Sequence, residues 1–240
     1  ANTEIYTLSL HDALPIYITQ IKRGCIATNQ PEIFLHGQII DVVVSQYPLF
    51  NHPTHFGEQI TINHRMQSLN GRIYPYSVQS TISLNKRLAL KCISDQNKYN
   101  AIIWLEKEEF FMTSDELLLS RLDLPPKTLR IMGTAKFITS IAHPIQMVNI
   151  KQKKGVVKNP SYSVKSAVVE GLAQSLIGAQ KIVNSVASPP FGKIISTFGQ
   201  NGNVIVEIIT PHLIKKGGEV SLEILKEFNL DFNKSYRFDG

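Results

Sequence analysis

A cluster of histidines is the first group in this sequence that could do chemistry. His52, His55 and His64 lie within thirteen positions, and Glu58 falls between them. A metal site needs several imidazole nitrogens or carboxylate oxygens that converge on one ion. The cluster therefore raises the hypothesis of a metal-assisted hydrolase. The alternative is a set of surface histidines in a polar loop, because Pro53 interrupts the stretch and no helix aims the rings in one direction.

A second group consists of lysines. Lys151, Lys153, Lys154 and Lys158 lie within residues 151–160, which contain no acidic residue. Lysine supplies a point charge for a phosphate but does not read a base, so any nucleic-acid binding would be independent of sequence and sensitive to salt. The alternative is that residues 151–160 are a solvated basic linker or an exposed loop.

Other catalytic signatures are absent from the sequence. We find no Gly-x-Ser-x-Gly elbow and no phosphate-binding loop that ends in Lys-Ser or Lys-Thr. Cys25 and Cys92 form neither a metal-binding spacing nor a disulfide framework, which favours a reducing compartment, the cytoplasm. The sequence predicts no cofactor. An enzyme for a small molecule, with a site built from residues distant in the chain, remains a third hypothesis.

Composition favours a binding protein. The 240 residues are 43% hydrophobic and 18% charged, which is typical of a folded domain, and no apolar run is long enough to span a bilayer. The net charge of +6 is uneven, because residues 151–240 hold 12 basic and 7 acidic groups. We therefore predict a non-catalytic binding or assembly protein, for example a subunit of a larger complex or particle. Its basic second half would contact an anionic partner. Such a partner includes non-specific nucleic acid, and self-association or a protein partner also fits.

The amino-terminal segment is set apart from this reasoning. Residues 7–16, Thr-Leu-Ser-Leu-His-Asp-Ala-Leu-Pro-Ile, resemble the peptide encoded by sequencing-adapter DNA in assembled metagenomic reads. We expect residues 1–16 to be non-native and exclude them from the prediction of fold and site.

The elements that must position these groups predict an α+β fold. Residues 17–150 form a β-rich antiparallel region, in which residues 33–44 are a buried strand rich in β-branched side chains. Residues 151–160 follow as the linker or loop. Residues 161–240 then contain a helix over 164–187 and a hairpin over 193–210, with its turn at Asn201-Gly202.

The predicted helix rests on two stripes at helical spacing. Bulky apolar residues form the first stripe: Val164, Val168, Leu172, Leu176 and Val183. Small residues form the second: Ser163, Ala167, Gly171, Ser175 and Ala179. Pro189 and Pro190 end the pattern, since proline lacks the amide donor. We expect the small face to pack closely on a sheet, such as the hairpin that follows.

Overall fold

The structure is a computed structural model, and it describes residues 5–7, 26–78, 86–94, 97–161, 165–210 and 214–236. Within these ranges the chain is almost entirely β-structure, with one short α-helix. Contacts divide it into a barrel unit, residues 1–148 with 228–237, and a basic unit, residues 149–227 with 238–240. In the described part of the chain, no helix has the length and apolar character needed to cross a membrane.

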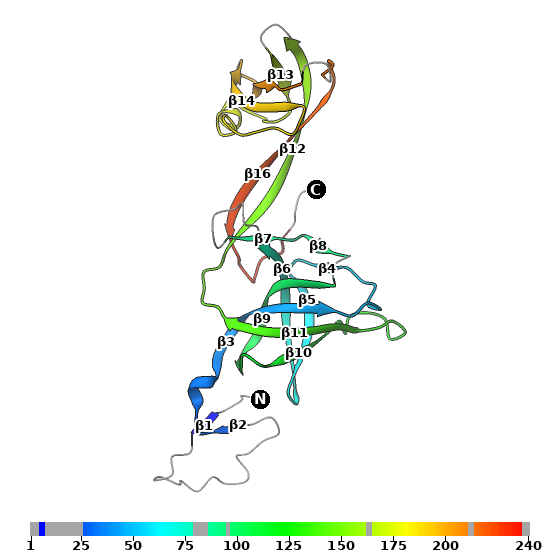
Figure 1. The fold of residues 1–240 in the computed structure, drawn as a ribbon, viewed down its shortest axis with the longest axis vertical. Helices are drawn as coiled ribbons and strands as arrows, with labels where there is room; N and C mark the ends of the chain where they lie inside the picture. Colours follow the sequence, from blue (N-terminus) through cyan, green and yellow to red (C-terminus); the bar gives the residue numbers. More distant parts are fainter. Residues whose placement is uncertain are drawn as a thin grey trace. The chain divides into compact units, whose positions relative to one another are not determined.

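The barrel unit contains the strands β1 to β11 and the start of β12 (Figure 1). Their bounds are β1 Ile5–Thr7, β2 Ile26–Thr28, β3 Leu35–Gln46, β4 Thr54–His55, β5 Glu58–His64, β6 Gln67–Val78, β7 Arg87–Ala89, β8 Cys92–Ile93, β9 Lys98–Phe111, β10 Glu116–Ser120, β11 Ile131–Ser140 and β12 Gln146–Ser161. A 3-10 turn at Pro31–Ile33 precedes β3. The strand predicted over 33–44 is therefore present as β3.

Six of these strands close into an antiparallel barrel. The order is β6-β5-β10-β11-β3-β9, and a second pairing of β9 with β6 completes the circle. Gly71 in β6 lies opposite Leu105 in β9. A β-carbon at Gly71 would lie 2.4 Å from the carbonyl oxygen of Trp104, so only glycine permits this approach of the two backbones.

The barrel interior explains why these segments form strands. Alternate residues of β3, such as Ile40, Val42 and Val44, are fully buried. They pack with Ile103 and Leu105 of β9 in one core cluster. β-Branched side chains suit a pleated surface that is buried on one face, and their spacing of two residues sends them all to the barrel interior.

Residues 228–236 complete the barrel unit through aromatic contacts. Phe232 stacks on Trp104 with 5.8 Å between ring centroids, and Arg72 Nη1 donates to the Phe232 carbonyl oxygen at 3.3 Å. Phe56 contacts the rings of Phe228 and Tyr236 edge-on. These contacts fix this returning segment to the barrel, although it follows the basic unit in sequence.

The basic unit is a second, smaller β-structure. It is built from β12, β13 Ser166–Glu170, α1 Leu176–Gln180, β14 Phe191–Phe198, β15 Asn203–Ile208 and β16 Glu219–Asn229. The sheet order is β14-β15-β13-β12, and β16 also pairs with β12. The predicted hairpin is present as β14 and β15. Gly199 and Gly202 take positive φ in its turn, at +67° and +76°.

The predicted α+β fold and its long helix over 164–187 are wrong. Ser163 and Val164 lie outside the described residues, residues 166–170 form strand β13, and α1 has only five residues. Ala167 and Val169 are buried with the half-exposed Val168 between them, which is the alternation of a strand. Gly171 then turns at φ +90°, a conformation that no helix contains.

Residues 151–160 also differ from their prediction as a linker or loop. They lie inside β12, where Gly155 and Val157 are buried and face the core of the basic unit. Of the adapter-like residues 1–16, the structure describes only Ile5–Thr7, whose backbone pairs in parallel with β2.

Candidate nucleic-acid interface

A shallow groove in the basic unit brings three of the predicted lysines together. Lys151, Lys153 and Lys154 of β12 form one side, and residues 171–175 with Gly178 form the other. The groove has a volume of about 390 Å³. Lys158 does not line it.

Two glycines hold the two sides of this groove together. A β-carbon at Gly155 in β12 would lie 2.7 Å from the Glu170 carbonyl oxygen, so the strand and the following turn are in backbone contact. A β-carbon at Gly171 would lie 3.3 Å from the Lys154 carbonyl oxygen. The turn is therefore laid directly beside the lysine-bearing part of β12. Ser175 accepts a hydrogen bond from the Gly178 amide and caps α1.

The four lysines differ in their charge partners. Lys158 Nζ lies 3.2 Å from Glu170 Oε2, and both side chains are about half exposed. Among the described residues, Lys153 and Lys154 make no ion pair. Residues 149–227 contain ten lysines, no arginine and five glutamates, a net charge of +5. The groove is thus positively charged within a positively charged unit, which attracts an anionic ligand.

The three histidines of the metal hypothesis lie in different settings. His52 packs its ring edge-on against Phe50, with 5.5 Å between centroids. His55 is exposed in β4, and its amide donates to Glu58 Oε2 at 3.0 Å. His64 is buried at the end of β5. In the part of the chain that the structure describes, no group of three His, Cys, Asp or Glu side chains is arranged to hold a metal ion.

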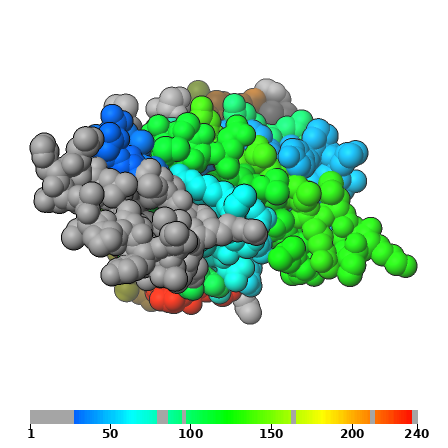
Figure 2. Space-filling view, turned by 90° about the horizontal axis from the view of Figure 1, so that it is seen from below, coloured from blue at the N-terminus to red at the C-terminus, as the bar shows by residue number. Residues whose placement is uncertain are grey.

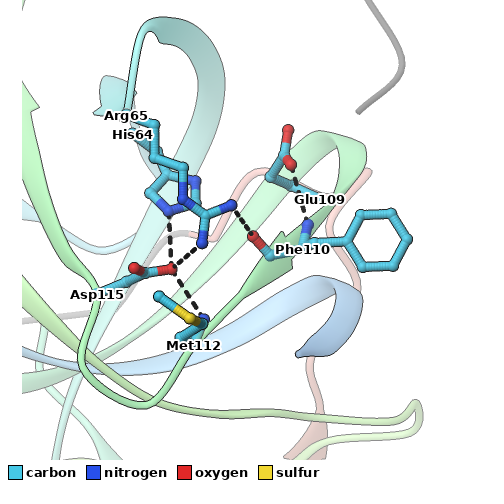
Figure 3. A network of polar contacts seen from close by, with 6 residues as sticks. All are labelled: His64, Arg65, Glu109, Phe110, Met112 and Asp115. Carbon is cyan, nitrogen blue, oxygen red and sulfur yellow. Dashed lines mark hydrogen bonds and ion pairs between the residues drawn. The ribbon is translucent and has the colours of Figure 1, made fainter. Parts of the chain in front are cut away.

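His64 belongs instead to a polar network centred on Asp115 (Figure 3). The Asp115 Oδ2 oxygen lies 2.9 Å from His64 Nε2, 2.9 Å from Arg65 Nη2 and 2.8 Å from the Met112 amide nitrogen. The His64 ring is only 3% exposed and stacks on Phe111. The network joins the β5–β6 hairpin, part of the cyan surface in Figure 2, to the β9–β10 turn. The network therefore ties these two turns of the barrel unit together through a largely buried carboxylate.

The stability of the barrel unit should depend on the protonation of His64. Burial lowers the pKa of His64 below its usual range, although the hydrogen bond to Asp115 opposes that shift. In the unfolded chain the pKa of histidine is about 6.5, so on acidification the unfolded state takes up this proton first. The contribution of His64 to the stability of the fold is therefore fully present above about pH 6.5 and is lost as the pH falls below that value.

Thermal melts of the protein and of His64→Gln between about pH 8 and pH 5 test this dependence. On acidification, the melting temperature of the parent should fall further than that of the variant, which has no titrating ring. Equal losses in the two proteins would show that the His64 imidazole does not couple to folding.

The second side of the groove was missed by sequence reasoning. Residues 171–175 were placed in the middle of a helix, where Gly171 and Ser175 would face a neighbouring element. A usable signal was present in the β-branched pair Val168-Val169, which Gly171 follows closely, because this pattern is typical of a strand that ends in a turn.

A second depression, of about 320 Å³, lies in the barrel unit. Its lining includes Asn70, Glu106 and Lys107 and has mixed charge.

The barrel region is similar in sequence to a known protein family. Residues 38–140 match the family model of the archaeal selenocysteine-specific elongation factor, domain III. This range begins within β3 and ends at the last residue of β11, so it includes residues of all six barrel strands. The selenocysteine-specific elongation factor of Methanocaldococcus jannaschii is 27% identical over 192 residues, which cover 77% of this chain and 39% of that protein.

Solved structures share the fold. Translation elongation factor SelB from Methanococcus maripaludis, as the apo form and in complex with the GTP analogue GppNHp, matches with a TM-score of 0.63 in both cases. The sequence identity is 22%, and the match covers 81% of this chain and 43% of those chains. The chain spans about two fifths of the length of these relatives.

Proposed function

We propose that this chain provides non-catalytic, RNA-binding domains of a selenocysteine-specific elongation factor. The observation that carries the proposal is the match of residues 38–140 to domain III of that family, because the matched range includes parts of all six strands of the closed barrel. The 27% identity to the Methanocaldococcus jannaschii factor extends over 192 residues, more than the barrel alone.

The charge of the basic unit supports RNA as the partner. Translation factors work on tRNA, mRNA and the ribosome, all of which present phosphate groups. Residues 149–227 have a net charge of +5, from ten lysines and five glutamates, and three of those lysines share a groove. Electrostatic attraction of this kind speeds association and strengthens binding at low salt. A cytoplasmic protein follows from the same proposal.

No comparable observation favours the metal-assisted hydrolase. Within the described residues, His52, His55 and His64 belong to no group that could hold a metal ion. The best-defined polar network instead uses His64 to satisfy a buried carboxylate.

Binding of the whole chain to labelled tRNA tests the proposed function. We expect tighter binding to a selenocysteine tRNA than to an elongator tRNA of similar length, measured by fluorescence anisotropy with unlabelled competitor. Co-sedimentation with ribosomes provides a second measurement. Equal affinity for both tRNAs, together with no co-sedimentation, would contradict the proposal.

A further inference from the structure

We propose that the groove beside β12 binds the phosphodiester backbone of double-stranded RNA through Lys151, Lys153 and Lys154. The choice of RNA rests on the proposed function, whereas the site and its chemistry rest on the basic unit alone. The family match ends at residue 140 and does not reach this groove.

Two of the three groove lysines, Lys153 and Lys154, carry charge that is available to a ligand. Among the described residues, Lys153 and Lys154 have no acidic partner, whereas Lys158 on the same strand is paired with Glu170 at 3.2 Å. Lys151 and Lys154 are exposed and Lys153 is half-buried. An ammonium group with no acidic partner binds a phosphate oxygen without first breaking an internal ion pair.

The opposite side of the groove permits a close approach. It presents Gly171, Ala173 and Gly178, whose side chains are absent or a single methyl group. Gln174, which is exposed, and the buried Leu172 also lie on this side, so the close approach is confined to the three small residues. The three lysines lie on one strand, where a rise of about 3.3 Å per residue spreads Lys151 and Lys154 over roughly 10 Å.

The lining of the groove favours paired over unpaired RNA. Proteins that bind single strands stack the free bases on aromatic rings. Among the residues that the structure describes, none that lines this groove is aromatic. Because lysine contacts phosphates without reading base edges, the ligand that remains is the regular backbone of a stem, bound without regard to sequence.

A matched pair of triple variants tests the site. The groove variant carries Lys151→Gln, Lys153→Gln and Lys154→Gln. The control variant carries Lys158→Gln, Lys193→Gln and Lys216→Gln, which remove the same total charge from the basic unit but do not line the groove. Affinity for a labelled RNA hairpin is measured by anisotropy over a range of salt concentrations, after thermal melts have shown that both variants fold.

The groove variant should bind the RNA stem at least about tenfold more weakly at low salt. The slope of log affinity against log salt should flatten by about 0.9 for each lost contact, so by roughly 2.7. The control should keep most of the affinity and slope. Equal losses in the two variants would show that only the overall charge matters and would overturn the site.

Two further arms separate shape from charge and paired from unpaired RNA. Gly178→Leu places a neutral side chain in the groove and should weaken binding with no change in charge, as long as its melt matches the parent. An unpaired RNA of equal length should compete more weakly than the stem. Stronger competition by the unpaired RNA would overturn the assignment to duplex RNA.

The outcomes also separate this inference from the proposed function. If the chain prefers a selenocysteine tRNA but the groove variant binds RNA as well as the parent, the proposed function is supported and the assignment of RNA binding to the groove is contradicted. If RNA stems bind through the groove without any preference among tRNAs, the assignment of RNA binding to the groove is supported and the proposed function is contradicted.

Discussion

Replacement of Gly71 by valine is expected to destabilise the barrel by about 3 kcal/mol, the upper part of the usual cost of overpacking. Even the β-carbon of the new side chain would lie 2.4 Å from the Trp104 carbonyl oxygen and 3.0 Å from Ile62 Cδ1. The carbonyl belongs to β9, so it cannot rotate away as a side chain would. Relief requires β6 and β9 to separate, and this pairing is the one that closes the barrel.

Trp104 makes the measurement specific, because it is the only tryptophan and lies beside Gly71 in the barrel unit. Its fluorescence during denaturant unfolding therefore reports on the barrel, while far-ultraviolet circular dichroism follows the whole chain. Gly178→Ala is the control, since its β-carbon would meet only side-chain atoms at 3.3 Å and 3.5 Å. The control should be neutral or gain up to about 1 kcal/mol of helix propensity. An unchanged fluorescence midpoint for Gly71→Val would mean that β6 and β9 do not approach as described.

Removal of the Asp115 carboxylate is expected to have a comparable effect. Asp115→Ala should cost ~3 kcal/mol, because it leaves the buried His64 nitrogen and the Met112 amide without their acceptor. Both donors lie within 2.9 Å of the same carboxylate oxygen, and the Asp115 side chain is only 12% exposed. Arg65 would lose its partner as well, at a more exposed position.

Asp115→Asn separates hydrogen bonding from charge. Its amide oxygen can still accept from Met112 or His64, but it has no negative charge for Arg65, so we expect a smaller loss than for alanine. Denaturant titrations followed by Trp104 fluorescence compare the three proteins. If alanine and asparagine reduce the free energy of unfolding equally, the ion pair with Arg65 accounts for the stabilisation and the buried hydrogen bonds do not.

The sequence by itself determined the β-character of the barrel and the charge of the basic unit. In β3 the β-branched residues are concentrated in one short run that includes Ile40, Val42 and Val44, and this richness is a property of the local chain. The Asn201-Gly202 pair likewise predicted the turn between β14 and β15. The concentration of lysines after residue 150 needed no structure to be seen.

Only the tertiary structure decided the secondary structure of residues 165–187. Their apolar and small residues recur at helical spacing, but β13 pairs with β12 on one side and β15 on the other, through registers such as Val157↔Val169 and Val169↔Val204. β12 directly precedes β13 in the sequence, whereas β15 follows it only after α1 and β14. The hydrogen bonds and packing with these two strands outweigh a local helix preference of a few tenths of a kcal/mol per residue.

The candidate site depended on the same long-range pairing. The sequence placed Lys151, Lys153 and Lys154 together, but it could not provide the second side of their groove, because the turn at Gly171 exists only once β13 has ended as a strand. It also grouped His64 with His52 and His55, whereas the fold takes His64 to Asp115, 51 residues away. Strand order and register bring such groups together, and neither is contained in the spacing of residues along the chain.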